Sequence, residues 1–259
     1  MPAGLSPAGH EVSWRSDMQR ILMGSAALLA MAGQVRAADW YTGAEAAERD
    51  AWIVAVDAST TVSSQGSQFA AATATAAPGG DLATSGPRLR VDAVIGSYRA
   101  QGTGGAASLG TQAEGAVMAG YAWASPEAVL AAYLGVDARR NELASAGRVT
   151  EAGGVGIKAA LDLYARPTAF TMIHATGSYA SPFNAYYGRI RAGVAAFAGG
   201  YVGPEVALLG DDFYRQWRIG AHLSGMQFGA LQLGLSGGYL RDQARKGGFY
   251  ATLDLRTGF

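Results

Sequence analysis

The sequence predicts an exported all-β protein whose mature part is a closed antiparallel transmembrane β-barrel of about twelve strands. Three observations predict it. An export signal precedes the main part of the chain, segments of alternating apolar and polar residues recur through the rest, and the chain ends on an aromatic residue, Phe259. In addition, 15% of the residues are charged, where about 25% is usual for a soluble domain. We therefore expect a bacterial outer-membrane location.

The first 37 residues have the composition of a cleaved signal peptide. A basic stretch precedes an apolar run over 21–33, and an A-x-A-like cleavage site follows at 35–37. As a helix this run would rise only about 20 Å, less than the roughly 30 Å hydrocarbon core of a bilayer. A retained membrane anchor is the alternative interpretation. Met18 is a second candidate for the true start, because it opens a signal of ordinary length.

The last segment of the chain shows the alternation most clearly. Leu253, Leu255 and Phe259 share one face, and Asp254 and Arg256 share the other. Successive side chains of a strand point to opposite faces, so one strand separates the apolar groups from the charges. A terminal aromatic residue on such a strand also resembles the signal by which outer-membrane barrels are recognised for assembly.

The same pattern divides residues 51–259 into twelve expected strands, after a periplasmic segment at 38–50. We expect the strands at 51–62, 67–77, 88–100, 109–123, 128–138, 153–164, 169–180, 185–198, 201–209, 214–225, 228–240 and 247–259. Ten strands is the alternative, because the segment 67–77 is rich in Ala and Thr.

The joints between these strands fall into two kinds. An even number of strands puts both termini of the chain on the periplasmic side. Short periplasmic turns are then expected at 124–127, 165–167, 198–200 and 226–227. Longer extracellular joints are expected at 101–108, 139–152 and 241–246.

Aromatic residues recur near the strand ends, which favours interfacial girdles at the level of the lipid headgroups. The expected girdle residues are Trp52, Tyr98, Tyr121, Trp123, Tyr164, Tyr179, Tyr186, Tyr187, Tyr201, Trp217 and Tyr239. Stacking on a glycan is the alternative at the extracellular side. The candidates for it are Tyr186, Tyr187, Phe213 and Tyr214.

Charged side chains on the polar faces define the expected lumen. Six are basic and seven acidic, and the set is Asp57, Arg90, Asp92, Glu114, Asp137, Lys158, Asp162, Arg189, Arg191, Glu205, Arg218, Asp254 and Arg256. Mutual pairing, which compensates buried charges, is one interpretation, and a selective path for an anionic or sugar solute is the other. Twelve strands lie between filled eight-stranded barrels and open sixteen-stranded ones. This favours a narrow or plugged passage.

The sequence predicts no catalytic residue, no cofactor and no metal site. Cys is absent, and no H-E-x-x-H, G-x-S-x-G or phosphate-loop pattern occurs. A lipid hydrolase would need a histidine as the base for a serine nucleophile, and His174 and His222 are the histidines that follow the signal. The 20 basic and 20 acidic residues of the chain give no excess charge for nucleic acid.

Several stretches resemble the cellulose biosynthesis protein BcsS family. They begin with Ala38-Asp39-Trp40-Tyr41-Thr42-Gly43 and include Gly156-Ile157-Lys158-Ala159-Ala160-Leu161-Asp162. The densest part comprises Tyr201-Val202-Gly203-Pro204-Glu205, Leu209-Gly210-Asp211-Asp212-Phe213 and Gln216-Trp217-Arg218-Ile219-Gly220-Ala221-His222-Leu223. The resemblance covers essentially the whole mature chain. It implies an outer-membrane part in making or exporting a cellulose-like exopolysaccharide, and it implies no catalytic residue.

Pattern and resemblance together predict a non-enzymatic outer-membrane accessory of cellulose or exopolysaccharide biosynthesis or secretion. The expected partners are outer-membrane lipids, the barrel assembly machinery, which would recognise Phe259, and cellulose synthase or secretion components or the polysaccharide itself. A small porin-like solute channel is the first alternative, and a lipid-modifying hydrolase is the second.

Overall fold

The computed structural model shows a closed antiparallel barrel and describes residues 53–78, 80–101, 107–145, 148–197, 199–243 and 247–259. The expected signal peptide (1–37) and periplasmic segment (38–50) lie outside these residues. The elements are β1 (Val54–Ser63), β2 (Gln68–Ala76), β3 (Gly86–Gln101), β4 (Ala107–Ala124), β5 (Ala128–Ser145), β6 (Arg148–Thr168), β7 (Thr171–Ala180), the 3-10 helix η1 (Pro182–Asn184), β8 (Ala185–Phe197), β9 (Gly200–Gly210), β10 (Arg215–Phe228), β11 (Leu231–Asp242) and β12 (Gly248–Gly258).

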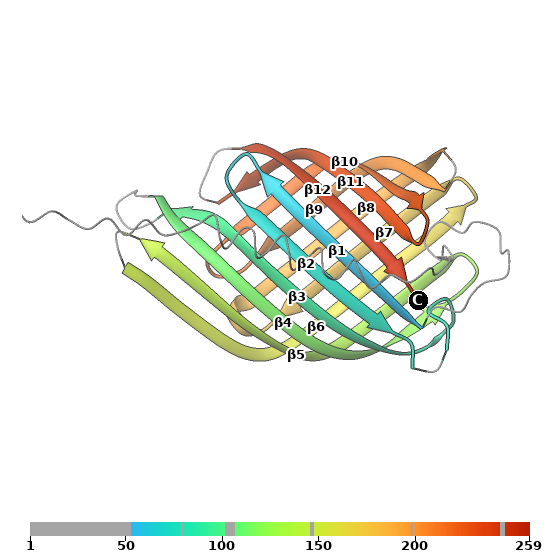
Figure 1. Ribbon diagram of the computed structural model, residues 1–259, viewed down its shortest axis with the longest axis horizontal. Helices are drawn as coiled ribbons and strands as arrows, with labels where there is room; N and C mark the ends of the chain where they lie inside the picture. The colour runs from blue at the N-terminus through green and yellow to red at the C-terminus, as the bar shows by residue number, and fades with distance from the viewer. Residues whose placement is uncertain (1–52, 79, 102–106, 146–147, 198, 244–246) are drawn as a thin grey trace, which may run out of the picture. The chain divides into compact units, whose positions relative to one another are not determined.

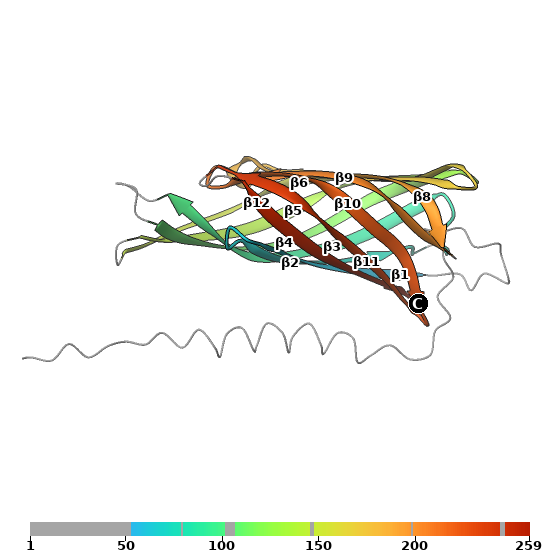
Figure 2. The same ribbon diagram turned by 90° about the horizontal axis from the view of Figure 1, so that it is seen from above.

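Each strand pairs with its neighbours in the sequence, and β1 also pairs with β12, which closes the barrel (Figure 1). At this seam the amide of Phe259 donates to the carbonyl of Val54 over 2.9 Å. The terminal end is the end of the barrel where β1 begins and β12 stops, and the distal end is the opposite one (Figure 2). No helix in the described part of the chain is long and apolar enough to cross a membrane.

The structure confirms the count of twelve strands, and the alternative of ten is wrong. The doubtful Ala/Thr-rich segment forms β2, which pairs along its length with β1 and β3. Small side chains do not prevent strand pairing here, because the backbone hydrogen bonds to two neighbours hold the segment.

Three expected joints are wrong. The segment expected as a loop at 139–152 is largely strand, because β5 extends to Ser145 and β6 begins at Arg148. Within it Glu142 lies opposite Glu151. The turns expected at 165–167 and 226–227 lie about three residues later, at 169–170 and 229–230. Each follows an irregularity in register, of β6 with β7 and of β10 with β11. Gly229 makes the later β10–β11 turn with φ +61°, a conformation that glycine adopts without a Cβ clash.

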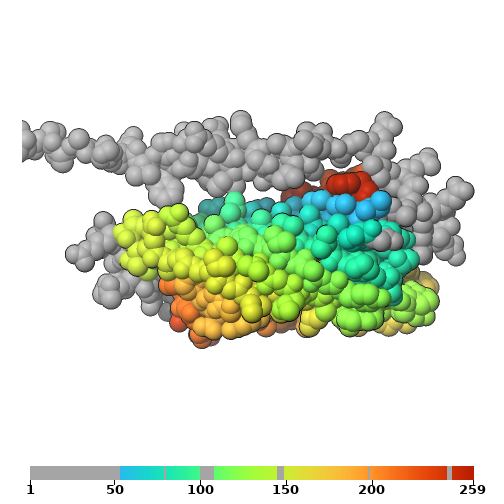
Figure 3. Space-filling view, turned by 90° about the horizontal axis from the view of Figure 1, so that it is seen from below, coloured from blue at the N-terminus to red at the C-terminus, as the bar shows by residue number. Residues whose placement is uncertain are grey.

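The outer face of the barrel is an apolar band between two groups of aromatic residues. Exposed branched aliphatic side chains occupy its middle, among them Val117, Leu134, Val136, Ile157, Leu161, Ile190, Val206, Ile219, Leu235 and Leu253. The distal group of exposed aromatics is Tyr179, Trp217, Tyr239 and Phe249, and the terminal group is Tyr121, Trp123, Phe170, Phe197 and Phe228. Figure 3 shows the continuous outer wall over β2 to β6.

The expected girdle is only partly right. Tyr98, Tyr164 and Tyr201 are buried in the barrel, and Tyr187 alternates with Arg189 and Arg191 on the inner face of β8. Trp52 lies outside the described residues. An aromatic residue near a strand end can point to either face, and only its parity relative to the charged residues of the same strand decides which.

Candidate functional site in the charged interior of the barrel

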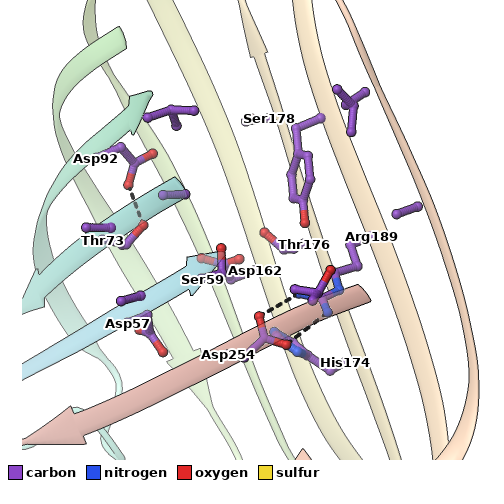
Figure 4. Close-up of a pocket in the computed structure, with 18 of the residues that line it drawn as sticks. Asp57, Ser59, Thr73, Asp92, Asp162, His174, Thr176, Ser178, Arg189 and Asp254 are labelled. Atoms are coloured by element: carbon purple, nitrogen blue, oxygen red, sulfur yellow. Dashed lines mark hydrogen bonds and ion pairs between the residues drawn. The ribbon is translucent and has the colours of Figure 1, made fainter. Parts of the chain in front are cut away.

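The barrel encloses a cavity of about 360 Å³, and side chains from all twelve strands line it. Figure 4 shows part of this lining. Twelve of the thirteen charged residues predicted for the lumen line it: Asp57, Arg90, Asp92, Glu114, Lys158, Asp162, Arg189, Arg191, Glu205, Arg218, Asp254 and Arg256. The thirteenth, Asp137, is completely buried in the inner face of β5. The alternation of the strands therefore brings the predicted charges into one interior.

A first ion network joins β3, β4, β5 and β6. The Arg90 side chain contacts Asp92 over 2.7 Å and also pairs with Asp162. Lys158 lies between Asp92 and Glu114, with its Nζ 3.0 Å from the Asp92 carboxylate. We refer to this set, with the two residues that extend it below, as the β3–β6 network. Each cation in it has two carboxylate partners, so the charges are compensated.

Arg139 extends the β3–β6 network to a distal loop. Its guanidinium pairs with Glu114 and, over 3.2 Å, with the Oδ2 atom of Asp211, which lies between β9 and β10. The other oxygen of Asp211 accepts the amide hydrogens of Phe213 and Tyr214 over 2.8 and 2.9 Å. Asp211 thus holds its own loop and connects it to the opposite wall. The sequence did not predict Arg139 and Asp211 as lumen residues, because both lie between the strands expected from the alternation.

A second network, the β8–β12 network, consists of Arg189, Arg191, Glu205, Asp254 and Tyr250. Arg189 binds both oxygens of Asp254, over 2.9 and 3.0 Å, and also contacts Glu205. Arg191 donates to Glu205 over 2.6 Å and pairs with Asp254. The Tyr250 hydroxyl donates to the second oxygen of Glu205 over 3.0 Å. Two cations and two carboxylates therefore satisfy one another across the lumen.

Two further arginines of the interior, Arg256 and Arg218, belong to neither network. Arg256 donates to Asp57 over 3.0 Å. Arg218 donates to Gln216 over 2.6 Å and to Thr61 over 3.3 Å, and it lies 5.5 Å from the centre of the Tyr250 ring. Among the described residues Arg218 forms no salt bridge, so neutral oxygens and an aromatic face surround this cation.

Arg88 ties the β2–β3 loop to the terminal end of the lumen. Its guanidinium donates to the carbonyls of Pro87, Leu82 and Thr84, the last two from that loop. The Leu82 side chain is buried and lines the cavity. The loop therefore turns inward and narrows the terminal end. Sequence reasoning missed Arg88 as a lumen residue although it shares the inner face with Arg90.

The four candidate glycan-stacking residues lie in different places. Tyr187 lines the cavity and shares the inner face of β8 with Arg189 and Arg191. Its neighbour Tyr186 has the opposite parity and pairs with Tyr179, although it also borders the cavity. Phe213 lies on the distal rim and is 38% exposed. Tyr214 is 2% exposed and stacks on Tyr98 with ring centres 4.6 Å apart. The stacking hypothesis is therefore wrong for Tyr214, because Tyr98 covers its ring.

The distal rim is held by contacts between two loops. The Asn184 amide donates to Asp212, and its oxygen accepts the Tyr179 hydroxyl over 3.0 Å. The Asp212 amide donates to the Phe183 carbonyl over 3.0 Å. Phe183 and Asn184 both have positive φ, at 57° and 50°, a conformation that side chains disfavour and that surrounding contacts must hold. These contacts hold the β7–β8 loop and the β9–β10 loop together.

Both histidines that follow the expected signal lie in the interior of the barrel. The Nε2 atom of His222 lies 3.1 Å from the Ala192 carbonyl, and its Nδ1 atom lies 3.2 Å from the Ser224 hydroxyl. Because a carbonyl only accepts, Nε2 carries the hydrogen and the serine donates to Nδ1. His174 lines the cavity beside the Tyr164 ring. No cluster of possible metal ligands occurs among the residues that the structure describes.

The family model described as "Cellulose biosynthesis protein BcsS" matches residues 58–259. The match extends from β1 to the last residue and so includes both ion networks. None of the curated proteins with which the chain was compared matches it.

Several solved barrels are similar to this chain. The KdgM porin has 9% identity, with 79% of this chain and 99% of the porin covered, at a TM-score of 0.46. The transport unit of the autotransporter AIDA-I from Escherichia coli has 9% identity, with 83% and 92% covered, at 0.48. The translocator domain of the autotransporter NalP from Neisseria meningitidis has 11% identity, with 95% and 96% covered, at 0.44. At these identities the likeness concerns the fold alone.

Proposed function

Because the chain belongs to the cellulose biosynthesis protein BcsS family, we propose that it is a non-enzymatic outer-membrane barrel that assists the synthesis or secretion of cellulose. The family match over residues 58–259 is the observation that carries the proposal. The matched region is the barrel itself, so the proposed role belongs to the barrel and its two mouths.

The outer face supports the location. An apolar band between two groups of exposed aromatic residues is the surface that a membrane barrel presents to lipid and to the two headgroup regions. In water the same exposed Val, Leu and Ile side chains would form an apolar patch far larger than soluble proteins tolerate. Outer-membrane fractionation, with heat-modifiable migration on a gel and a β-rich circular dichroism spectrum in detergent, tests the location. A helical spectrum or a soluble protein would refute it.

The inner face supports an accessory role more than free transport. The β8–β12 network joins strands across the lumen, and the β3–β6 network ties the distal β9–β10 loop to the wall. Arg88 draws the β2–β3 loop over the terminal end. A cellulose chain could not pass without separating compensated buried charges, which is costly. We therefore propose that the protein docks or anchors the secretion machinery, or holds a short length of the polymer, rather than serving as its open conduit.

Deletion of the gene tests the proposed function. We expect less cellulose at the cell surface while the synthase activity of isolated membranes stays normal, and we expect the wild-type gene to restore the surface cellulose. Unchanged surface cellulose in the deletion strain, together with normal synthase activity, would contradict the proposal.

A small-solute channel is the second candidate function, and the cavity favours it. Asp57 and Asp162 keep 40% and 28% of their side chains exposed although both line the cavity, so part of the lumen is open to water. Liposome swelling in solutions of small sugars tests this candidate. Swelling at the rate of empty liposomes would eliminate the channel, and rapid swelling would favour it over the accessory.

A further inference from the structure

We propose that the cavity binds a short segment of a neutral glycan, with the ring of Tyr187 as the stacking surface for one sugar. This inference rests on the proposed function in that it names the polymer that the barrel would hold. The cavity volume of about 360 Å³ lies within the range of ligand sites. The chemistry of the wall around Tyr187 selects the class of ligand.

Among the inward tyrosines of the described residues, Tyr187 keeps the largest exposed surface. It shares the inner face of β8 with Arg189 and Arg191 and lines the cavity, yet it is 37% exposed. The other inward tyrosines named above, Tyr98, Tyr164, Tyr201, Tyr214 and Tyr250, are between 1% and 5% exposed. An aromatic ring with an open face in a cavity is a surface on which the apolar C–H face of a sugar can pack, while the hydroxyl remains available for a hydrogen bond.

Hydroxyl groups line the wall next to this ring. Ser178 lies directly opposite Tyr187 in the pairing of β7 with β8, and Thr176 lies two residues further along the same face. Figure 4 shows Ser59 on β1 and Thr73 on β2. Asp162 on β6 lies directly opposite Thr176 in the pairing of β6 with β7. Serine and threonine hydroxyls both donate and accept, and a carboxylate accepts from two donors. Such groups match a ligand whose rim consists of hydroxyls.

The charges of the cavity favour a neutral ligand. Its lining holds eight basic residues (Arg88, Arg90, Arg139, Lys158, Arg189, Arg191, Arg218 and Arg256) and seven acidic ones (Asp57, Asp92, Glu114, Asp162, Glu205, Asp211 and Asp254). Asp137, buried in the same wall, adds an eighth acid. An anionic polymer would find few cations that are not already paired, and it would meet partly exposed carboxylates at Asp57 and Asp162. A neutral polyol meets neither obstacle.

Titration calorimetry with the full chain folded in detergent tests the proposal. The probes are cellotetraose, which is neutral, and tetragalacturonate, which is anionic and of the same length. We expect cellotetraose to bind and tetragalacturonate to bind at least about tenfold more weakly. Absence of cellotetraose binding, or tighter binding of the anionic probe, would overturn the proposal.

An inward and an outward tyrosine provide a matched pair of variants. Tyr187→Ala removes the ring inside the cavity and should weaken cellotetraose binding about tenfold. Tyr239→Ala removes an exposed ring on the outer face of β11 and should leave the binding unchanged. Tyr187→Phe keeps the stacking surface and should retain most of the affinity. Equal losses in Tyr187→Ala and Tyr239→Ala would refute the site.

A second variant covers the case in which Tyr187→Ala does not give a folded, heat-modifiable barrel. The double variant Thr176→Val/Ser178→Ala removes the adjacent hydroxyls with little change of volume and should also weaken cellotetraose binding. Unchanged binding in this variant would refute the hydroxyl wall. Deletion of the gene tests the proposed function separately. Normal surface cellulose combined with cellotetraose binding would reject the function and keep the site, and the reverse result would do the opposite.

Discussion

The two ion networks of the lumen differ in how completely their charges are satisfied. In the β8–β12 network each of two arginines contacts both Glu205 and Asp254. In the β3–β6 network three cations face four carboxylates, Asp92, Glu114, Asp162 and Asp211, with Asp137 buried nearby, and the chain of contacts continues into a distal loop. The β8–β12 network is therefore a closed set of ion pairs that joins strands across the lumen. The β3–β6 network has more acidic than basic side chains and connects the wall to a loop.

Similar charged side chains therefore have two different structural roles in one lumen. The β8–β12 network joins two strands that are four positions apart around the barrel. It does so because Asp254 on β12 lies between two arginines of β8. The β3–β6 network runs along adjacent strands and controls the position of the β9–β10 loop through Arg139. We therefore expect changes in the first to affect the stability of the barrel and changes in the second to affect its distal mouth.

The largest effect is expected for Glu205→Ala. This change leaves Arg189, Arg191 and the Tyr250 hydroxyl without a shared buried acceptor, and removing one partner of a buried ion network costs about 3–5 kcal/mol. The free energy of unfolding in lipid vesicles, measured by urea titration of tryptophan fluorescence, checks it. Asp162→Ala is the control in the other network and should cost about 1 kcal/mol, because Asp162 is partly solvated and Arg90 keeps Asp92. Equal losses in the two variants would remove the distinction between the networks.

An intermediate effect is expected for Asp211→Asn. The remaining side-chain oxygen can still accept the amides of Phe213 and Tyr214, but the ion pair with Arg139 is lost. The loss of one hydrogen bond to a charged group is worth about 1.5–3 kcal/mol at most. We expect faster amide hydrogen exchange in the β9–β10 loop and unchanged exchange in the terminal turn before Ala128. Unchanged exchange at Phe213 and Tyr214 would show that Arg139 does not hold this loop.

The smallest effect is expected for Arg140→Ala. Arg140 pairs with Glu142 over 3.0 Å and with Glu151 over 2.9 Å on the outer face, but its side chain is 59% exposed. Exposed pairs contribute about 0–1 kcal/mol and are screened by salt. The unfolding free energy should fall by no more than this at low salt and not at all at high salt. A loss of unfolding free energy as large as that of Glu205→Ala would mean that outer and inner ion pairs contribute equally to stability.

Much of the fold could be predicted because the alternation of apolar and polar residues shows which side chains of a strand share a face. Leu253 and Leu255 separate from Asp254 and Arg256 whichever partner strands are chosen, so the inner face of β12 followed directly. The ends of β5 and β6 could not be predicted this way. Arg140, Glu142 and Glu151 have the composition of a loop, and only their cross-strand pairs show that the hairpin continues as a strand.

The site was predictable in its composition but not in its contacts. Parity identified Arg189, Arg191 and Asp254 as inward residues, but which carboxylate meets which arginine depends on register across strands that are distant in the sequence. The adjacent Tyr186 and Tyr187 illustrate the same limit. Both are tyrosines at a strand end and both border the cavity, but only Tyr187 has the parity of the inward residues Arg189 and Arg191.

The central claim is that compensated charges and an inward loop keep this membrane barrel from acting as an open pore, so that it works as an accessory. Planar-bilayer recording of the purified wild-type protein tests this most directly. We expect no steady conductance from the wild type. A steady conductance whose ion selectivity shifts in Arg189→Glu or Arg191→Glu would contradict the claim and identify the protein as a channel.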